Sequence, residues 1–250
     1  LKQEETNTNI IKEKNDDIIQ SINYALRIQK AILPTLDYVK KHLPNSFILY
    51  KPKDIVAGDF YWIEVKEGAI LFAAADCTGH GVPGAMVSVV CNNGLNRAVR
   101  EYNLIEPGEI LNKTRQIVIE EFEKSEDDVK DGMDIALCLL KGDKLMYAGA
   151  HNPLWIIRKG ARVIEEVKAD KQPIGKFSSL QPYTLHSIQL YEGDTIYVFT
   201  DGYVDQFGGE KGKKFKAKAF RELLLSIQDK NMEEQQTIID AVFENWKGNL

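Results

Sequence analysis

The sequence has little cysteine, no long apolar run and no excess of positive charge, and each shortage excludes a class of protein. Its three cysteines, Cys77, Cys91 and Cys138, lie far apart and form no C-x-x-C pair. Neither a disulfide framework nor a thiolate zinc site is therefore expected. No run approaches the roughly 18 apolar residues of a spanning helix, and the N-terminus lacks a signal-peptide pattern. We expect a cytoplasmic chain that makes no contact with a membrane.

The charge balance argues against nucleic acid as a partner. The chain has 32 lysines and arginines against 37 aspartates and glutamates, which gives a formal net charge of -5. Such a surface does not attract a polyanion. With 250 residues, 44% of them hydrophobic, the chain is long enough to bury a full core. A globular protein that binds no nucleic acid is predicted.

The first 33 residues are polar and charged, contain no glycine or proline, and predict a helix. Ile11, Ile18, Ala25 and Ile32 recur at steps of seven, whereas the alternate heptad positions are mostly polar. The helix either packs on the domain or connects the domain to an upstream sensor module. The start at a residue other than Met favours the connector. Residues 1–33 are thus expected to form a regulatory helix that supports a weak homodimer.

The rest of the chain, residues 34–250, is expected to form one domain in which runs of strands are interrupted by one helix pair and closed by another. This order is typical of an α+β domain with antiparallel sheets rather than of alternating βαβ units. Strands are expected in the runs 47–50, 60–65, 69–76, 133–140, 144–150, 154–159, 162–167, 184–190 and 194–202, and helices over 83–102, 107–124, 217–228 and 233–246.

The stretch DCTGHGVPGAM, residues 76–86, contains a literal G-x-G-x-x-G after an apolar strand. A dinucleotide-binding fingerprint needs a second parallel strand within a βαβ unit of about 30 residues. Here one helix follows another, and the next strand begins only near residue 134. An oxidoreductase remains an alternative that a nicotinamide titration would test. The favoured interpretation is an aspartate at a strand end, followed by glycines that allow close backbone approach.

Four aspartates lie at the ends of predicted strands: Asp59, Asp76, Asp134 and Asp201. Taken singly, each fits an ordinary turn or strand cap. Carboxylates at the ends of several strands can converge, however, and converging carboxylates repel unless a cation neutralises them. Oxygen ligands suit hard ions such as Mg²⁺ and Mn²⁺. The four positions together therefore indicate a divalent metal site.

Six motifs, spread in order over about residues 20–250, resemble the SpoIIE-like branch of the metal-dependent protein serine/threonine phosphatases, the PPM superfamily. They are SINYALRIQKAILP, AGDFYW, DCTGHGVPGAM, AGAHNP, QPIG and VFTDGYVDQ. The resemblance implies an αββα sandwich of two mainly antiparallel sheets flanked by helix pairs. It also implies hydrolysis of phosphoserine or phosphothreonine by a water held between two or more Mn²⁺ or Mg²⁺ ions.

The resemblance also assigns roles to single residues. Asp76 matches the ligand shared between two metals, Asp201 the ligand of the DG motif, and Asp59 and Asp134 the supporting ligands. By the same match, the backbone carbonyl of Cys77 coordinates a metal. Asp76 and Asp201 are in this sense the catalytic carboxylates.

Three further side chains have more than one interpretation, and a fourth, His151, has one. Asp131 lies close enough to Asp134 to compete for its role. His80, in the glycine loop, either protonates the leaving serine oxygen or orders the loop through backbone hydrogen bonds. Asp205 either orients a metal-bound water or caps a turn. His151 is expected to be structural.

The sequence departs from the family pattern in three places. Ala57 replaces a usual glycine, and Trp62 replaces a usual aspartate. A C-terminal strand that carries an acidic residue is expected to be missing, which leaves a catalytically impaired scaffold as the alternative function. The intact aspartates argue for the enzyme.

The resemblance implies a partner as well. In bacteria, the usual substrates of the family are phosphorylated anti-anti-sigma factors or similar STAS-type regulators. The basic run Glu210 to Lys218 follows the loop of Asp201. This run is either a solvated face or a contact for an acidic partner or for the phosphate.

Overall fold

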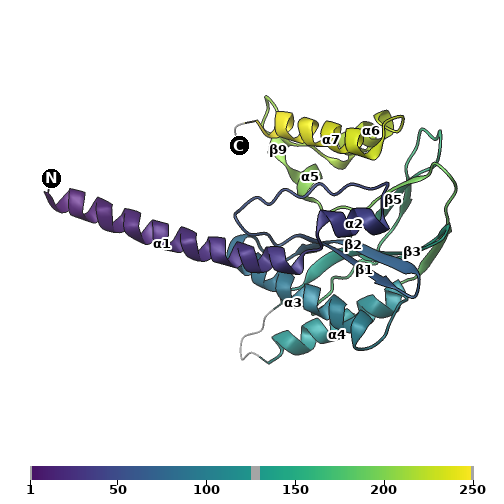
Figure 1. Ribbon diagram of the computed structural model, residues 1–250, viewed down its shortest axis with the longest axis horizontal. Coiled ribbons are helices and arrows are strands. Elements are labelled where there is room, and N and C mark those ends of the chain that lie inside the picture. Colours follow the sequence, from purple (N-terminus) through teal and green to yellow (C-terminus); the bar gives the residue numbers. More distant parts are fainter. Residues whose placement is uncertain (1, 125–129, 249–250) are drawn as a thin grey trace.

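Two antiparallel sheets lie between two pairs of helices in the computed structural model, which describes residues 2–124 and 130–248 (Figure 1). The larger sheet has five strands in the order β1-β2-β3-β4-β7. Its strands are β1 (Phe60–Lys66), β2 (Ala69–Cys77), β3 (Met133–Lys141), β4 (Lys144–Ala150) and β7 (His186–Gln189). The smaller sheet has the order β6-β5-β8, with strands β6 (Glu165–Val167), β5 (Leu154–Ile157) and β8 (Thr195–Tyr197).

Helices cover the outer face of each sheet (Figure 1). The pair α3 (Gly81–Arg100) and α4 (Pro107–Phe122) packs on the larger sheet, and the pair α6 (Ala217–Ser226) and α7 (Met232–Lys247) packs on the smaller one. The remaining elements are two short helices, α2 (Leu36–His42) and α5 (Gly202–Asp205), and a two-stranded ribbon, β9 (Phe207–Gly208) and β10 (Lys213–Lys214). The αββα sandwich implied by the family resemblance is thus confirmed.

Three apolar clusters correspond to the interfaces between these layers. One joins the larger sheet to α3 and α4, a second joins the smaller sheet to α6 and α7, and a third fills the space between the sheets. Strand β2 shows why the sequence folds this way, because its residues alternate between buried and half-buried along its whole length. Both of its faces are covered by other layers.

The helices begin where the sequence supplies caps. Glu106 accepts hydrogen bonds from two backbone N–H groups at the start of α4, whose first residue is Pro107. Asn231 and Glu234 form a capping box at the start of α7. Because these local signals fix the helix starts, α4 and α7 begin at or within one residue of the positions expected from the sequence.

The apolar run 47–50 is not a strand, contrary to the expectation from the sequence. Phe47 and Leu49 pack against the cluster between the smaller sheet and α7. The carbonyl of Ile48 accepts a hydrogen bond from the side chain of Gln236 at 3.0 Å. The run is apolar because it packs under a helix as an extended segment, without a ladder partner.

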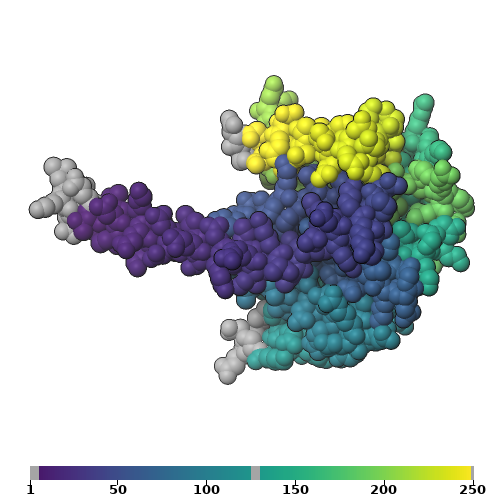
Figure 2. Space-filling model, viewed as in Figure 1, coloured from purple at the N-terminus to yellow at the C-terminus, as the bar shows by residue number. Residues whose placement is uncertain are grey.

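The N-terminal helix α1 (Lys2–Ile32) projects from the body of the protein, and only its C-terminal part reaches the domain (Figures 1 and 2). Ile11 and Ile18 of the heptad-spaced series are 61% and 56% exposed. Gln29, near the C-terminal end, is only 3% exposed. In the described part of the chain, no helix combines the length and apolar character needed to cross a membrane.

Candidate active site

Three of the four predicted metal ligands lie at one edge of the larger sheet. Asp76, near the end of β2, pairs directly with Asp134, near the start of β3. Phe60 of β1 pairs with Ala75, so that Asp59, one residue earlier, lies beside Asp76. Antiparallel pairing therefore brings the three carboxylates together, because the end of one strand meets the starts of its neighbours.

The fourth ligand comes from the other sheet. Asp201 follows β8 and stands immediately before α5. The preceding residue, Thr200, donates a hydrogen bond from its hydroxyl to Oδ2 of Asp59 at 2.6 Å. This bond joins the two sheets at the site and holds the carboxylate of Asp59 in one orientation. Sequence reasoning missed Thr200, although it lies within the VFTDG motif.

The carboxylates lie within one another's electrostatic field. The pKa of Asp76 is raised to about 8, first by burial and then by the negative charges of Asp59, Asp201 and Asp134. The pKa of Asp201 is also raised, by burial and by the charges of Asp205 and Asp59. Two neighbouring acids whose pKa values are raised by burial and by nearby carboxylates mark a candidate functional site on physical grounds.

The donor set fits a hard divalent cation. Its side-chain donors are all carboxylate oxygens, and a cation among them would remove their mutual repulsion. Across residues 2–124 and 130–248, no three His, Cys, Asp or Glu side chains are already placed to ligate one ion. To share an ion, the carboxylates of Asp59, Asp76, Asp134 and Asp201 would have to rotate toward one another.

The thiol of Cys77 is buried in the apolar cluster between the larger sheet and the helices α3 and α4. Burial together with the neighbouring Cys91 raises the pKa of this thiol well above its usual value. A Cβ atom on Gly58 would lie 3.0 Å from the carbonyl oxygen of Cys77 and 2.7 Å from that of Gly79. Glycine at position 58 therefore lets the segment that carries Asp59 approach this carbonyl.

The glycine loop is built for close backbone packing. Gly79 and Gly81 have φ angles of 83° and 61°, which glycine adopts readily. A Cβ atom on Gly84 would lie 2.4 Å from the carbonyl oxygen of Gly79. The G-x-G-x-x-G spacing thus reflects a loop folded tightly onto itself and onto the segment before β1.

His80 stands at the start of α3 but caps no backbone N–H of that helix through its side chain. Its Nδ1 lies 2.9 Å from Oδ2 of Asp54, and its side chain is 77% exposed. The contact with Asp54 was not anticipated from the sequence. It orients the imidazole ring.

The two aspartates that compete for one role at the start of β3 have different hydrogen-bond partners. Oδ1 of Asp134 lies 2.8 Å from Nδ1 of His151, whose backbone N–H in turn donates to the carbonyl of Asp170 at 2.9 Å. Asp131 instead accepts a hydrogen bond from the hydroxyl of Thr78 at 2.7 Å. His151 therefore orients the side chain of Asp134, a more specific role than the structural one expected from the sequence.

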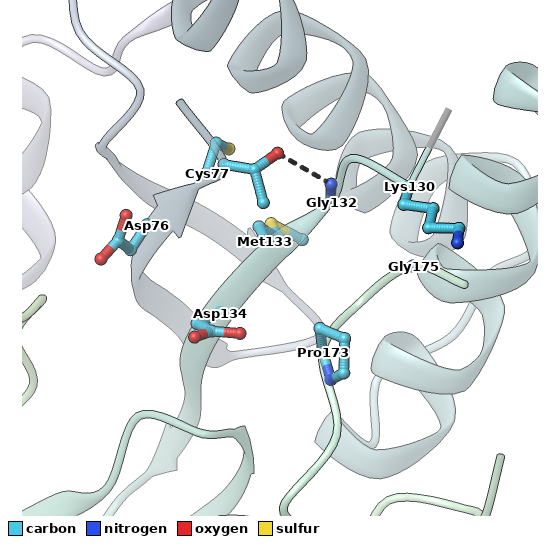
Figure 3. Close-up of a pocket in the computed structure, with 9 residues that line it drawn as sticks. Asp76, Cys77, Lys130, Gly132, Met133, Asp134, Pro173 and Gly175 are labelled. Atoms are coloured by element: carbon cyan, nitrogen blue, oxygen red, sulfur yellow. Dashed lines mark hydrogen bonds between the residues drawn. The ribbon is translucent and has the colours of Figure 1, made fainter. Parts of the chain in front are cut away.

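A cavity of about 160 Å³ opens beside the paired strand ends. Figure 3 shows the carboxylates of Asp76 and Asp134 together on one side of the cavity, with Pro173 across from them. The backbone N–H of Gly132 donates to the hydroxyl of Thr78 at 3.2 Å, the bond that is dashed in Figure 3. This bond joins the segment that follows β2 to the segment that precedes β3, and both segments line the cavity. The arrangement provides a hollow that is bordered by the carboxylates of Asp76 and Asp134.

Gln29 of α1 is fastened to the segment that leads to Asp59. Its Nε2 donates to the carbonyl of Ala57 at 2.6 Å and to the hydroxyl of Ser88 at 3.1 Å. The N–H of Ala57 donates back to Oε1 of Gln29 at 3.1 Å. The buried side-chain amide of Gln29 thus links α1 to α3 and to the segment that precedes Asp59. Sequence reasoning missed it, since Gln29 lies at an alternate heptad position.

Comparisons with known proteins agree with this fold. A family model described as stage II sporulation protein E (SpoIIE) matches residues 66–248. The solved SiaA-PP2C domain of Pseudomonas aeruginosa is 29% identical, with a TM-score of 0.84, and the match covers 94% of this chain and 93% of that one. No curated protein sequence matches.

More distant solved structures share the fold at lower identity. The PP2C phosphatase domain of SpoIIE from Bacillus subtilis is 17% identical, with a TM-score of 0.58, over 76% of this chain and 53% of that one. The RsbU and RsbW domains of Rv1364c from Mycobacterium tuberculosis are 16% identical, with a TM-score of 0.61, over 79% of this chain and 53% of that one.

Proposed function

The chain belongs to the SpoIIE family of PPM-type protein serine/threonine phosphatases, and from that premise we propose that it dephosphorylates a bacterial regulatory protein by metal-assisted hydrolysis. The observation that carries the proposal is the meeting of Asp59, Asp76 and Asp134 at one sheet edge, with Asp201 delivered from the second sheet. These are the four acidic positions of the metal-binding motifs. A scaffold without catalysis has no need for repelling carboxylates at all four.

The roles of the residues follow from their contacts. Two Mn²⁺ or Mg²⁺ ions, held by the four aspartates and the carbonyl of Cys77, would supply a water of lowered pKa aimed at phosphorus. Thr200 fixes Asp59, and His151 fixes Asp134. Because Nδ1 of His80 faces Asp54, its Nε2 is the nitrogen that gives a proton to the leaving serine or threonine oxygen.

The proposed substrate is a phosphorylated STAS-type regulator. Solved structures of similar fold include the RsbU and RsbW domains of one protein and a protein of the bacterial stressosome. These names place the fold in regulatory systems and motivate the choice of substrate. No metal preference follows from them, although one neighbour, RsbX, was solved in complex with magnesium.

The proposal is tested by measuring hydrolysis of p-nitrophenyl phosphate and of phosphorylated STAS-type proteins with Mn²⁺, with Mg²⁺ and with EDTA. A phosphatase hydrolyses both kinds of substrate only when metal is present. Absence of metal-dependent hydrolysis for every substrate would favour the scaffold alternative. Saturable nicotinamide binding would favour the oxidoreductase.

The anchoring of α1 predicts a second effect. Replacing Gln29 with alanine leaves the buried N–H and carbonyl of Ala57 without their side-chain partner, which is expected to lower the free energy of unfolding by about 1–3 kcal/mol. It should also lower kcat/KM for a phosphoprotein by about tenfold, because Asp59 loses its support. The exposed Gln20 provides the matched control. A Gln29→Ala enzyme as active and as stable as Gln20→Ala would contradict this role.

Residues 1–33 are proposed to form a regulatory arm that pairs weakly with the arm of a second copy. The exposed Ile11 and Ile18 lie seven residues apart, and burying them in a dimer would remove apolar surface from water. Replacing both with glutamate should abolish concentration-dependent association in sedimentation velocity. Asn9→Glu with Gln20→Glu adds the same charge at neighbouring exposed positions and should leave association intact. Loss of association in both double variants would attribute the effect to charge alone.

A further inference from the structure

The proposed mechanism leaves the basic segment after the site without a role. We define the lysine hairpin as residues 207–218, which comprise β9, its turn, β10 and the start of α6. The segment carries five lysines and one glutamate in a chain whose net charge is -5. All five lysines are exposed. Local charge of this sign stands out against an otherwise acidic protein and marks a surface for an acidic partner.

The lysine hairpin is held firmly against the C-terminal helix. The N–H of Gly209 donates to the carbonyl of Trp246 at 2.8 Å, and the indole N–H of Trp246 donates to the carbonyl of Gln206 at 2.9 Å. A Cβ atom on Gly208 would lie only 1.8 Å from the carbonyl oxygen of Trp246. Tight seating on α7 fixes the backbone that carries the lysines, which lowers the entropy lost when a partner binds.

The backbone at Lys216 is strained in a way that few side chains tolerate. Its φ and ψ angles are 74° and 149°, a region that is occupied almost solely by glycine. Hydrogen bonds on either side hold it there: Phe215 N–H donates to the carbonyl of Gln206 at 3.0 Å, and Lys216 N–H donates to that of Val204 at 2.7 Å. Strained positions of this kind cluster at binding sites, and here the chain places a lysine where glycine would cost less.

The lysine hairpin begins next to the catalytic carboxylates. Only the four-residue α5 and Gln206 separate it from Asp201. Lys214 pairs with Asp205 of α5 at 2.6 Å and lies 5.9 Å from the ring centroid of Phe207, which is itself 53% exposed. Among the described residues, Lys214 is the one lysine of the five that forms an ion pair. Four cations and an exposed ring thus remain available beside the site.

We propose that the lysine hairpin docks an acidic segment of the protein substrate next to the phosphorylated residue, and so determines which phosphoproteins are hydrolysed. This inference rests on the proposed phosphatase function and names the chemistry of its substrate. A flanking acidic segment gains from several exposed lysines at once, and the ring of Phe207 offers an apolar contact within the same surface. The docking energy acts on substrate binding and leaves the metal-assisted step unchanged.

The test compares two phosphoserine peptides of equal length, one flanked by glutamate and one flanked by lysine, together with p-nitrophenyl phosphate. The wild-type protein should show a kcat/KM about tenfold higher for the acidic peptide at low salt, and the preference should shrink as salt is added. Lys211→Glu with Lys213→Glu should remove the preference by raising KM, with kcat and p-nitrophenyl phosphate hydrolysis unchanged. Arginine at both positions should preserve it.

A second lysine-bearing hairpin provides the matched control. Lys141 and Lys144 pair across the β3–β4 turn, are exposed, and lie at the end of β3 opposite Asp134. Lys141→Glu with Lys144→Glu makes the same change in net charge and should leave the preference intact. Equal loss in both double variants would overturn the proposal in favour of a general charge effect. Binding of phosphatidylserine vesicles without any peptide preference would assign the surface to a membrane and also overturn it.

Lys216→Gly separates docking from folding. Glycine relieves the positive φ angle, so the thermal midpoint should stay the same or rise, while KM for the acidic peptide should rise because a cation is lost. An unchanged KM would show that Lys216 is not part of the docking surface. It would also contradict the inference that the strained backbone at Lys216 serves substrate binding. If the wild-type protein does not hydrolyse p-nitrophenyl phosphate with metal, the phosphatase function itself fails. Hydrolysis without peptide preference overturns only the docking surface.

Discussion

Replacing Asp76 with asparagine is expected to lower Mn²⁺-dependent phosphatase activity by about a hundredfold to a thousandfold while leaving the fold intact. Asparagine keeps the size of the side chain but removes the charge that would bridge two cations, and one misplaced electrostatic group in such a site costs about 10²–10³ in rate. Asp201→Asn should have a similar effect. The measurements are initial rates with p-nitrophenyl phosphate over a Mn²⁺ titration, with circular dichroism to check folding.

The start of β3 supplies the matched control for this experiment. Asp134 is oriented by His151 within the carboxylate group, whereas Asp131 bonds to Thr78. Asp134→Asn should therefore weaken Mn²⁺ binding measured by calorimetry, while Asp131→Asn should bind Mn²⁺ almost as the wild-type protein does. Full activity in Asp76→Asn or Asp201→Asn would remove that residue from the metal site. A larger defect in Asp131→Asn than in Asp134→Asn would reverse the assignment of the supporting ligand.

Local sequence signals account for much of the architecture and for part of the site. Continuous apolar runs predict the strands around Asp76 and Asp134, and antiparallel pairing of these strands makes their ends neighbours. Glycines with positive φ mark the loop after Asp76. Because a strand end, a turn and a helix cap each depend on only a few consecutive residues, these features could be predicted without knowing which strands pair.

The contacts that orient the ligands could not be predicted in the same way. The bond from Thr200 to Asp59 joins residues 141 positions apart, and that from Gln29 to Ala57 joins a heptad helix to a loop. Neither has a local pattern, since each depends on how the layers pack. The prediction of a strand over the apolar run 47–50 was wrong for the same reason. The run is apolar because it packs under α7, whereas a strand also needs a neighbouring strand to pair with, which this run lacks among the residues that the structure describes.

The raised pKa of Asp76 makes the stability of the metal-free protein depend on pH. The folded-state pKa is about 8, against a model-peptide value of 3.8, so the folded protein holds a proton between these values that the unfolded chain releases. The contribution of Asp76 to the free energy of unfolding should therefore be highest below about pH 4, fall as pH rises, and level off above about pH 8. After allowance for solvent screening, the expected loss is on the order of 3 kcal/mol.

Urea denaturation in EDTA at pH 5 and pH 8 measures this loss. The difference between the wild-type protein and Asp76→Asn isolates the contribution of this one carboxyl group, since the two proteins share every other titratable group. The asparagine variant should be more stable than the wild type at pH 8, because it removes a buried charge repelled by Asp59, Asp201 and Asp134. Excess Mn²⁺ should reverse the order, because the wild-type protein gains binding energy that the variant cannot. Identical pH slopes in the two proteins would mean that Asp76 does not carry the repulsion that the proposed metal ions would relieve.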